Sequence, residues 1–166
     1  MNEADAEKLL RLLVDAGLPF TLVGGLAAIS HGASTFTRDV DVAMPLDEDT
    51  LPRLLEALAP VHPRHATRLD LGVVTDPDRL RGFRLLLFVT DLGRLDILGE
   101  LPPHDDVRSL PSVERVFGDG LRVQVLDIDA LIAVKAYVGR PKDRLMESEL
   151  RAIRAAMKPD ASERKS

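Results

Sequence analysis

Residues 20–44 read FTLVGGLAAISHGASTFTRDVDVAM, and this stretch decides the fold. It begins with the apolar run Phe20–Val23, which predicts a short buried strand. The pair Gly24-Gly25 interrupts the run, and Leu26–His31 then predicts a short helix. Arg38–Met44 alternates polar and apolar residues, which is typical of a strand with one apolar face. The stretch therefore predicts a strand, a glycine turn, a helix and a second strand.

Two carboxylates, Asp39 and Asp41, lie on the polar face of the second predicted strand. Residues two apart on a strand point to the same side, with Cα atoms roughly 6.6 Å apart. Carboxylates held together repel each other, and a cation between them relieves the repulsion. Mg²⁺ favours such hard oxygen ligands, so the pair indicates a metal site for phosphoryl or nucleotidyl transfer. A solvated strand face is the alternative interpretation.

The glycine turn and a third carboxylate extend this pattern. Glycine lets a phosphate approach the backbone closely, and free N–H groups at a helix start bind anions. Steric need alone also places glycine in such turns. Asp96 lies inside GRLDIL, residues 93–98, between Leu95 and Ile97. If these neighbours face the core, we expect Asp96 beside Asp39 and Asp41, and an exposed polar position is the alternative.

Periodicity over the rest of the chain predicts an α+β domain with a mixed central sheet flanked by helices and a C-terminal helical appendage. We expect further helices over residues 2–16, 49–59, 130–138 and 142–157, and further strands over 69–75, 83–89, 93–98 and 121–126. We expect one domain over residues 1–158, with an α/β core over 1–126, C-terminal helices over 127–158 and a disordered tail over 159–166.

Composition narrows the classes of function. The chain has 166 residues, a net charge of −5 and no cysteine, so disulfides, thiolate metal sites and cysteine nucleophiles are excluded. The negative charge argues against a broad nucleic-acid-binding face. No apolar run approaches the roughly 20 residues of a membrane helix, and the N-terminus does not resemble a signal peptide. We therefore expect a cytoplasmic protein with no membrane partner.

The order VGG, thirteen residues, DVD and a later strand aspartate resembles the nucleotidyltransferase superfamily, which has the polymerase-beta-like fold. The form GG-A-HG-T-DVD is similar to the bacterial branch that includes the abortive-infection-type nucleotidyltransferase toxins and related small proteins. In that branch, a later Lys-x4-Arg and a following aspartate belong to the site. This chain has Lys135, Arg140 and Asp143 in matching order.

The resemblance implies roles for individual residues. Metal ligation and catalysis would fall to Asp39, Asp41 and Asp96, with two Mg²⁺ or Mn²⁺ ions and with Asp96 as the base that activates an acceptor hydroxyl. Nucleotide binding would fall to Gly24, Gly25, Lys135, Arg140 and Lys142, and supporting roles to Thr37, Arg38 and Asp143. The chain departs from the family in two ways: Leu26 offers no hydroxyl to a phosphate, and the chain is shorter than the larger toxins, which leaves less room for an acceptor-binding domain. For Lys135, the alternative is a lysine that extends its ammonium to solvent.

The implied function is metal-dependent transfer of a nucleoside monophosphate from an NTP to a hydroxyl. The acceptor would be a protein side chain, an RNA 3′ end or a small molecule. The protein would act in a toxin–antitoxin or defence system, with a cognate toxin or antitoxin as partner. The alternative is a non-catalytic nucleotide-binding or antitoxin-like partner with the same fold.

Overall fold

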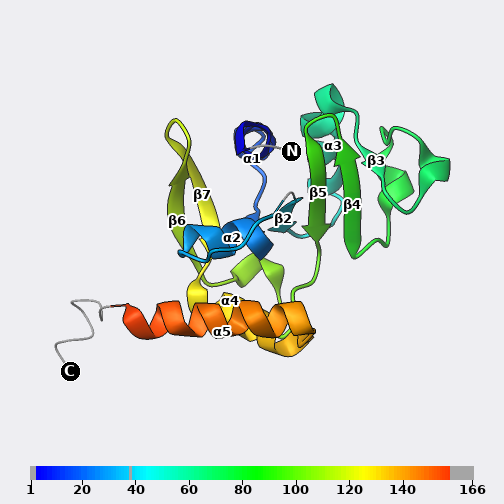
Figure 1. Ribbon diagram of the computed structural model, residues 1–166. Helices are drawn as coiled ribbons and strands as arrows, with labels where there is room; N and C mark the ends of the chain where they lie inside the picture. The colour runs from blue at the N-terminus through cyan, green and yellow to red at the C-terminus, as the bar shows by residue number, and fades with distance from the viewer. Residues whose placement is uncertain (1–2, 38, 158–166) are drawn as a thin grey trace.

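A single seven-stranded sheet forms the centre of the computed structural model, which describes residues 3–37 and 39–157 (Figure 1). The strands are β1 (Thr21–Val23), β2 (Asp39–Ala43), β3 (Arg64–His65), β4 (Leu85–Thr90), β5 (Gly93–Leu98), β6 (Ser112–Phe117) and β7 (Leu121–Leu126). The helices are α1 (Glu3–Asp15), α2 (Gly24–Ser30), α3 (Thr50–Leu58), α4 (Ile128–Val138) and α5 (Pro141–Ala156). The predicted α+β class with a mixed sheet is confirmed.

The sheet is mixed because β2 has neighbours of both directions. The strand order is β3-β4-β5-β2-β1-β7-β6. β2 pairs antiparallel with β1 and parallel with β5, while β1 pairs parallel with β7. The outer pairs, β3–β4, β4–β5 and β6–β7, are antiparallel. The two strands predicted to carry carboxylates, β2 and β5, are therefore neighbours in the sheet.

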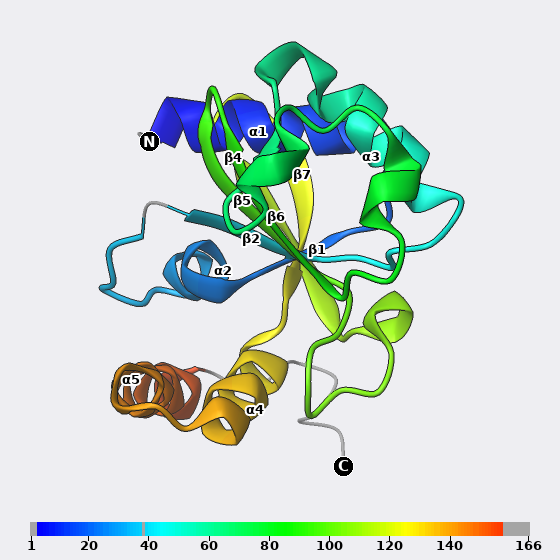
Figure 2. The ribbon, with the colours of Figure 1, turned by 90° about the vertical axis from the view of Figure 1, so that its right-hand side faces the viewer.

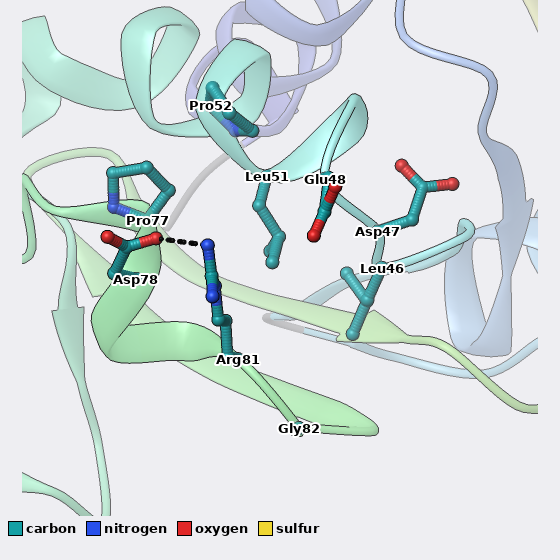
Figure 3. A pocket seen from close by; sticks show the side chains of 9 residues that line it. All are labelled: Leu46, Asp47, Glu48, Leu51, Pro52, Pro77, Asp78, Arg81 and Gly82. Atoms are coloured by element: carbon teal, nitrogen blue, oxygen red, sulfur yellow. Dashed lines mark ion pairs between the residues drawn. The ribbon is translucent and has the colours of Figure 1, made fainter.

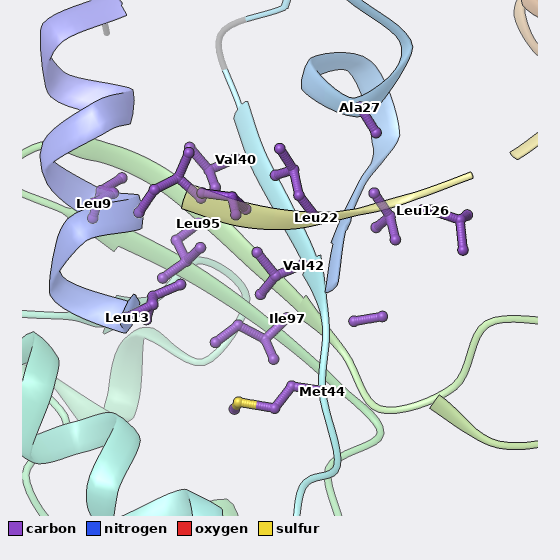
Figure 4. Close-up of a cluster of buried hydrophobic side chains, with 14 of the residues drawn as sticks. Leu9, Leu13, Leu22, Ala27, Val40, Val42, Met44, Leu95, Ile97 and Leu126 are labelled. Atoms are coloured by element: carbon purple, nitrogen blue, oxygen red, sulfur yellow. The ribbon is translucent and has the colours of Figure 1, made fainter. Parts of the chain in front are cut away.

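Helices cover the two faces of the sheet unequally. Figure 2 shows α1 and α3 together on one side, and α2 with the α4–α5 pair on the other. The apolar positions of β2 and β5 alternate toward α1, and a period of two sends the intervening residues to the opposite face. Figure 4 shows part of this core, which includes Leu9, Leu13, Val40, Val42, Leu95 and Ile97. The core thus fixes which face the polar residues of β2 and β5 occupy.

The C-terminal helices begin and end where residue chemistry dictates. The Asp127 carboxylate accepts a hydrogen bond from the Ala130 N–H and caps α4. Gly139, at φ 66°, ends that helix in the left-handed conformation, and Pro141 opens α5. No helix among the described residues is long and apolar enough to cross a membrane.

Two sequence predictions need correction. The strand predicted over residues 69–75 is wrong: Leu69–Leu71 forms a 3-10 turn, and Val73 makes only an isolated bridge to Arg64. Its neighbour β3 has only two residues, so the segment forms a single bridge and no strand. The helix predicted from Leu26 begins earlier, at Gly24.

Two strands, β3 and β6, were not predicted. β3 has only two residues, too few to show a period. β6 alternates exposed and half-buried residues, but charged Glu114 and Arg115 hide its pattern. The turn Gly118-Asp119-Gly120 between β6 and β7 was the available hairpin signal. The predicted disordered tail lies outside the described residues.

Candidate functional site

Three carboxylates share one face of the sheet. Asp41 of β2 lies in register with Asp96 of β5, and Asp39 lies in register with Arg94. The chain neighbours Val40 and Leu95 are fully buried on the opposite face, and the three aspartates are only partly buried. The structure thus brings together the three residues that the sequence singled out as carboxylate ligands.

Crowding of negative charge changes the protonation of this cluster. Burial, the charges of Asp96 and Asp39 and a hydrogen bond with Asp96 together raise the pKa of Asp41 to about 7. The charge of Lys135 acts in the opposite direction. At neutral pH a proton is therefore partly retained where a divalent cation would otherwise balance the charge.

Arg94 belongs to the same cluster, and the sequence reasoning missed it. Its Nε donates a hydrogen bond of 3.1 Å to Oδ1 of Asp96. This bond and the charge of Asp96 raise the pKa of Arg94. The signal was available, because the alternation in GRLDIL places residues 94 and 96 on one face.

The two glycines allow α2 to lie directly against β2. A Cβ at Gly24 would lie 2.9 Å from Cβ of Asp41, and Gly24 has φ +68°. A Cβ at Gly25 would lie 2.8 Å from Cβ of Thr37. Such distances exclude any larger residue without a shift of the backbone. The glycines therefore allow the side chains of Asp41 and Thr37 to pack directly against the backbone at the start of α2.

The loop before β2 positions Asp39. Oγ1 of Thr37 accepts a hydrogen bond of 3.2 Å from the Asp39 N–H. Farther back, Oε1 of Glu149 on α5 accepts hydrogen bonds of 2.6 and 2.7 Å from the N–H and hydroxyl of Ser34. Glu149 thus ties this loop to the C-terminal helix, a link that sequence reasoning missed. Arg38, predicted as a supporting residue, lies outside the described residues.

A second charge cluster lies where α4 meets α5. Asp143, only 1% exposed, accepts a hydrogen bond of 2.6 Å from Nε of Arg140 and one of 3.4 Å from Nζ of Lys135. Burial alone raises the pKa of Asp143, but the hydrogen bond from Arg140 and the charge of Lys135 outweigh it, so the net pKa is lowered. Lys142, beside Asp143 in the first turn of α5, is exposed.

Lys135 connects the two clusters. Its side chain is only 19% exposed, and it acts electrostatically on Asp41 while it pairs with Asp143. Arg140, in contrast, is 58% exposed and held by Asp143. The reading of Lys135 as a lysine that merely extends to solvent is therefore wrong.

The carboxylate donors suit a hard divalent cation. Asp39, Asp41 and Asp96 supply only oxygen ligands, and burial together with the charges of Asp96 and Asp39 raises the pKa of Asp41. Within residues 3–37 and 39–157, however, no three acidic, histidine or cysteine side chains are arranged so that they could hold a metal ion. Asp96 instead turns one oxygen toward Arg94, so binding of a metal would require that carboxylate to rotate.

The hollow in Figure 3 lies elsewhere, beyond the carboxyl end of β2. It encloses about 340 Å³ and is lined by Leu46, Asp47, Glu48, Leu51, Pro52, Pro77, Asp78, Arg81 and Gly82. Arg81 and Asp78 form an ion pair of 3.0 Å across part of its wall. None of the predicted site residues lines it, so the candidate site is an open sheet face and not this hollow.

Comparison with known proteins finds likeness in structure alone. No protein-family profile and no curated protein sequence matches this chain. The lincosamide antibiotic adenylyltransferase LnuA, solved with lincomycin bound, is similar with a TM-score of 0.61 and 13% identity, over 92% of this chain and 98% of LnuA.

Two further solved structures are similar over most of their length. A nucleotidyltransferase-like protein from Paracoccidioides brasiliensis has a TM-score of 0.64 and 12% identity, over 95% of this chain and 77% of that one. The antibiotic-resistance factor ANT(2'')-Ia has a TM-score of 0.55 and 19% identity, over 93% of this chain and 89% of that protein. The strand order, the glycine turn against Asp41 and these likenesses agree: the chain has the fold of the nucleotidyltransferase superfamily.

Proposed function

We propose that this protein is a metal-dependent nucleotidyltransferase that moves a nucleoside monophosphate from an NTP to a hydroxyl group. The observation that carries the proposal is the register of β2 and β5, which sets Asp39, Asp41 and Asp96 on one open face. Burial and the charges of the neighbouring carboxylates raise the pKa of Asp41 to about 7, so three ionised carboxylates on this face repel one another. Such an arrangement destabilises the protein unless a cation offsets it.

In the proposed reaction, the acceptor oxygen forms a bond to the α-phosphorus of the NTP. The bond from that phosphorus to the bridging oxygen breaks, and pyrophosphate leaves. Asp96 accepts the proton of the acceptor hydroxyl, and Asp39 and Asp41 flank the reacting phosphate. Bound Mg²⁺ or Mn²⁺, held by these three carboxylates, would supply the positive charge that stabilises the attacking and leaving oxygens.

The remaining residues bind the nucleotide. Gly24 and Gly25 lie against Asp41 and Thr37 and would contact the β- and γ-phosphates of the nucleotide. Lys135, oriented by Asp143, offers its ammonium to the triphosphate. Arg140 is exposed enough to exchange part of its contact with Asp143 for a phosphate, and Lys142 lies next to the same cluster.

The similar solved structures support this reaction type. LnuA is an adenylyltransferase, and ANT(2'')-Ia has been solved with adenylyl-2''-tobramycin, a nucleotide joined to an antibiotic. Membership of a toxin–antitoxin or defence pair, with a cognate partner, and a cytoplasmic setting stay predictions from the sequence resemblance.

Calorimetry with each of the four NTPs, with and without Mg²⁺, tests the proposed site. We expect Mg²⁺-dependent binding that Asp41→Asn abolishes and Asp91→Asn preserves. Asp91 is the matched control, because it is an exposed aspartate in the β4–β5 turn that pairs with His62. Equal NTP binding by wild type and Asp41→Asn would refute the metal-binding role.

The non-catalytic alternative draws on the Arg94–Asp96 ion pair, which occupies the carboxylate proposed as base. Turnover separates the two functions. An α-labelled NTP incubated with Mg²⁺ and cell extract should label a discrete acceptor with wild type and not with Asp39→Ala. Tight NTP binding without any transferred label would favour the non-catalytic protein.

A further inference from the structure

Helix α5 contacts both halves of the proposed site. Near its start, Asp143 holds the cationic half, because its carboxylate accepts hydrogen bonds from both cations of that cluster. Six residues later, Glu149 contacts the loop of residues 31–37, which follows α2 and leads toward Asp39 at the start of β2. A helix rises about 1.5 Å per residue, so the two contact points lie roughly 9 Å apart along one rigid element. The position of α5 therefore bears on both halves together.

The contact between Glu149 and this loop is short and double. Oε1 of Glu149 accepts a hydrogen bond of 2.6 Å from the Ser34 N–H and one of 2.7 Å from the Ser34 hydroxyl. Both bonds lower the pKa of Glu149 below its ordinary value, so the carboxylate is ionised at neutral pH and keeps both donors. Hydrogen bonds to an ionised acceptor are shorter and stronger than those between neutral groups.

A second contact with the loop lies on the same face of α5. Residues four apart on a helix are neighbours on its surface, so Ile153 lies beside Glu149. Cδ1 of Ile153 is 4.0 Å from the position that a Cβ on Gly32 would occupy, and Gly32 turns the chain with φ +104°. Side chains of α5 thus meet the loop at Gly32 and again at Ser34 (Figure 2). The loop is held against the helix at two points.

The loop carries this constraint to the carboxylate face. Three residues after Ser34, the Cβ of Thr37 lies 2.8 Å from the position of a Cβ on Gly25, so Thr37 packs against the glycine turn. Oγ1 of Thr37 accepts a hydrogen bond of 3.2 Å from the Asp39 N–H. Energetic coupling between distant groups can follow such contiguous contacts. Ser34 and Thr37 therefore form a path from α5 to the first carboxylate of the site.

We propose that Glu149 is a positioning residue for nucleotidyl transfer: through Ser34 it holds the loop, and with it Asp39, at a fixed distance from the cationic half of the site. The inference rests on the proposed function. Glu149 contacts neither the nucleotide nor the acceptor, and it acts only on the geometry of groups that do. A displacement of about 1 Å in such groups can lower a rate about 100-fold.

Hydrogen exchange followed by mass spectrometry tests the link without substrate or metal. In Glu149→Ala, we expect amide exchange in the loop peptide to rise at least about fivefold. Glu149→Gln should stay close to wild type, because glutamine keeps a carbonyl oxygen for Ser34. The control is Glu147→Ala on the same helix, which removes an ion pair with Arg151 and should leave the loop unchanged. Unchanged exchange in Glu149→Ala, or an equal rise in both alanine variants, would overturn the inference.

Turnover tests the effect on the site. With each α-labelled NTP, saturating Mg²⁺ and cell extract, Glu149→Ala should lower the rate of label transfer at least about tenfold, and Glu149→Gln should retain about half of the wild-type rate. Ser34→Ala should lower the rate less, since the Ser34 N–H still donates. It should add no further loss in the Glu149→Ala background, because both changes act on one link.

The outcomes separate this inference from the proposed function. Additive losses in the double variant would overturn the path through Ser34. Wild-type turnover that Glu149→Ala leaves intact would overturn the positioning role alone, as would an equal loss of turnover in Glu147→Ala. Wild type that binds no Mg²⁺·NTP in calorimetry would instead refute the proposed function.

Discussion

Two charge clusters carry the proposed chemistry, and they are balanced differently. Asp143 is almost completely buried, yet its pKa is lowered because Arg140 and Lys135 both donate to it. Asp41 is partly buried, and its pKa is raised to about 7 by that burial and by the two carboxylates that share its face. The neighbours of a carboxylate, and not its burial alone, decide its charge.

The two clusters differ in whether the charge of their carboxylates is balanced by neighbouring cations. The Asp143 cluster satisfies its own carboxylate and leaves one excess positive charge, which suits a phosphate. The Asp41 cluster has three carboxylates and one arginine, so it retains excess negative charge that suits a divalent cation. Lys135 lies between them, which places the cationic and anionic halves of the proposed site side by side.

Loss of the anionic half should have the largest effect on activity. Asp41→Asn keeps the shape of the side chain but removes a charged ligand, and we expect nucleotidyl transfer to fall at least about 100-fold. Initial rates with labelled NTP measure the change, with Asp91→Asn as control. A variant that retains more than about a tenth of the wild-type rate would place the chemistry elsewhere.

Loss of the buried carboxylate should have the largest effect on stability. Asp143→Ala leaves Lys135 and Arg140 without their shared partner, at a cost of about 2–3 kcal/mol in the free energy of unfolding, because both cations can partly rehydrate. The control is Asp129→Ala, which breaks an exposed ion pair with Arg154 and should cost less than about 1 kcal/mol. Urea unfolding measures both, and equal costs would contradict the comparison.

The pH dependence of stability should have opposite signs in the two clusters. The folded pKa of Asp41 is above its ordinary value of 3.8, so the folded state binds the extra proton and loses stability as pH rises through about 7. Without metal at pH 8, Asp41→Asn should therefore be more stable than wild type by about 2 kcal/mol, or about 4–8 °C in Tm. This advantage should shrink toward pH 5 and when Mg²⁺ is added to wild type.

For Asp143 the folded pKa is lowered, so its contribution is present above 3.8 and is lost as pH falls through the lowered pKa. The destabilisation caused by Asp143→Asn should accordingly be constant from pH 5 to pH 8 and shrink below pH 4. Thermal unfolding across this range measures both trends. Parallel pH profiles for the two variants would show that the clusters do not differ as described.

Removal of the arginine from the anionic half should have the smallest effect. Arg94→Met frees Asp96 from its ion pair, but Arg94 is 40% exposed and solvent screens its charge. We expect Mg²⁺ affinity to rise no more than about threefold to tenfold and Tm without metal to fall by about 1–2 °C. Calorimetric titration with Mg²⁺ checks the affinity, and weaker binding would make Arg94 part of the site's support instead of its competitor.

Much of the fold followed from local periodicity. The stretch of residues 20–44, β5, β7 and both C-terminal helices appear within one or two residues of their predicted ends, because each has a clear apolar period or a strong cap. The prediction failed where pairing with another strand decides the structure. Residues 69–75 have the pattern of a strand but meet only the two-residue β3, and β6 is a strand because β7 pairs with it.

By itself, the sequence determined the candidate residues, since the alternation of β2 and β5 places Asp39, Asp41 and Asp96 on polar faces whatever their neighbours are. Only the tertiary structure decided what those residues meet. The parallel register of β2 with β5 sets Asp41 beside Asp96 and Arg94, and the packing of α5 on α4 gives Asp143 two cations. Charge and pKa depend on distances between groups far apart in the chain, and those distances exist only after folding.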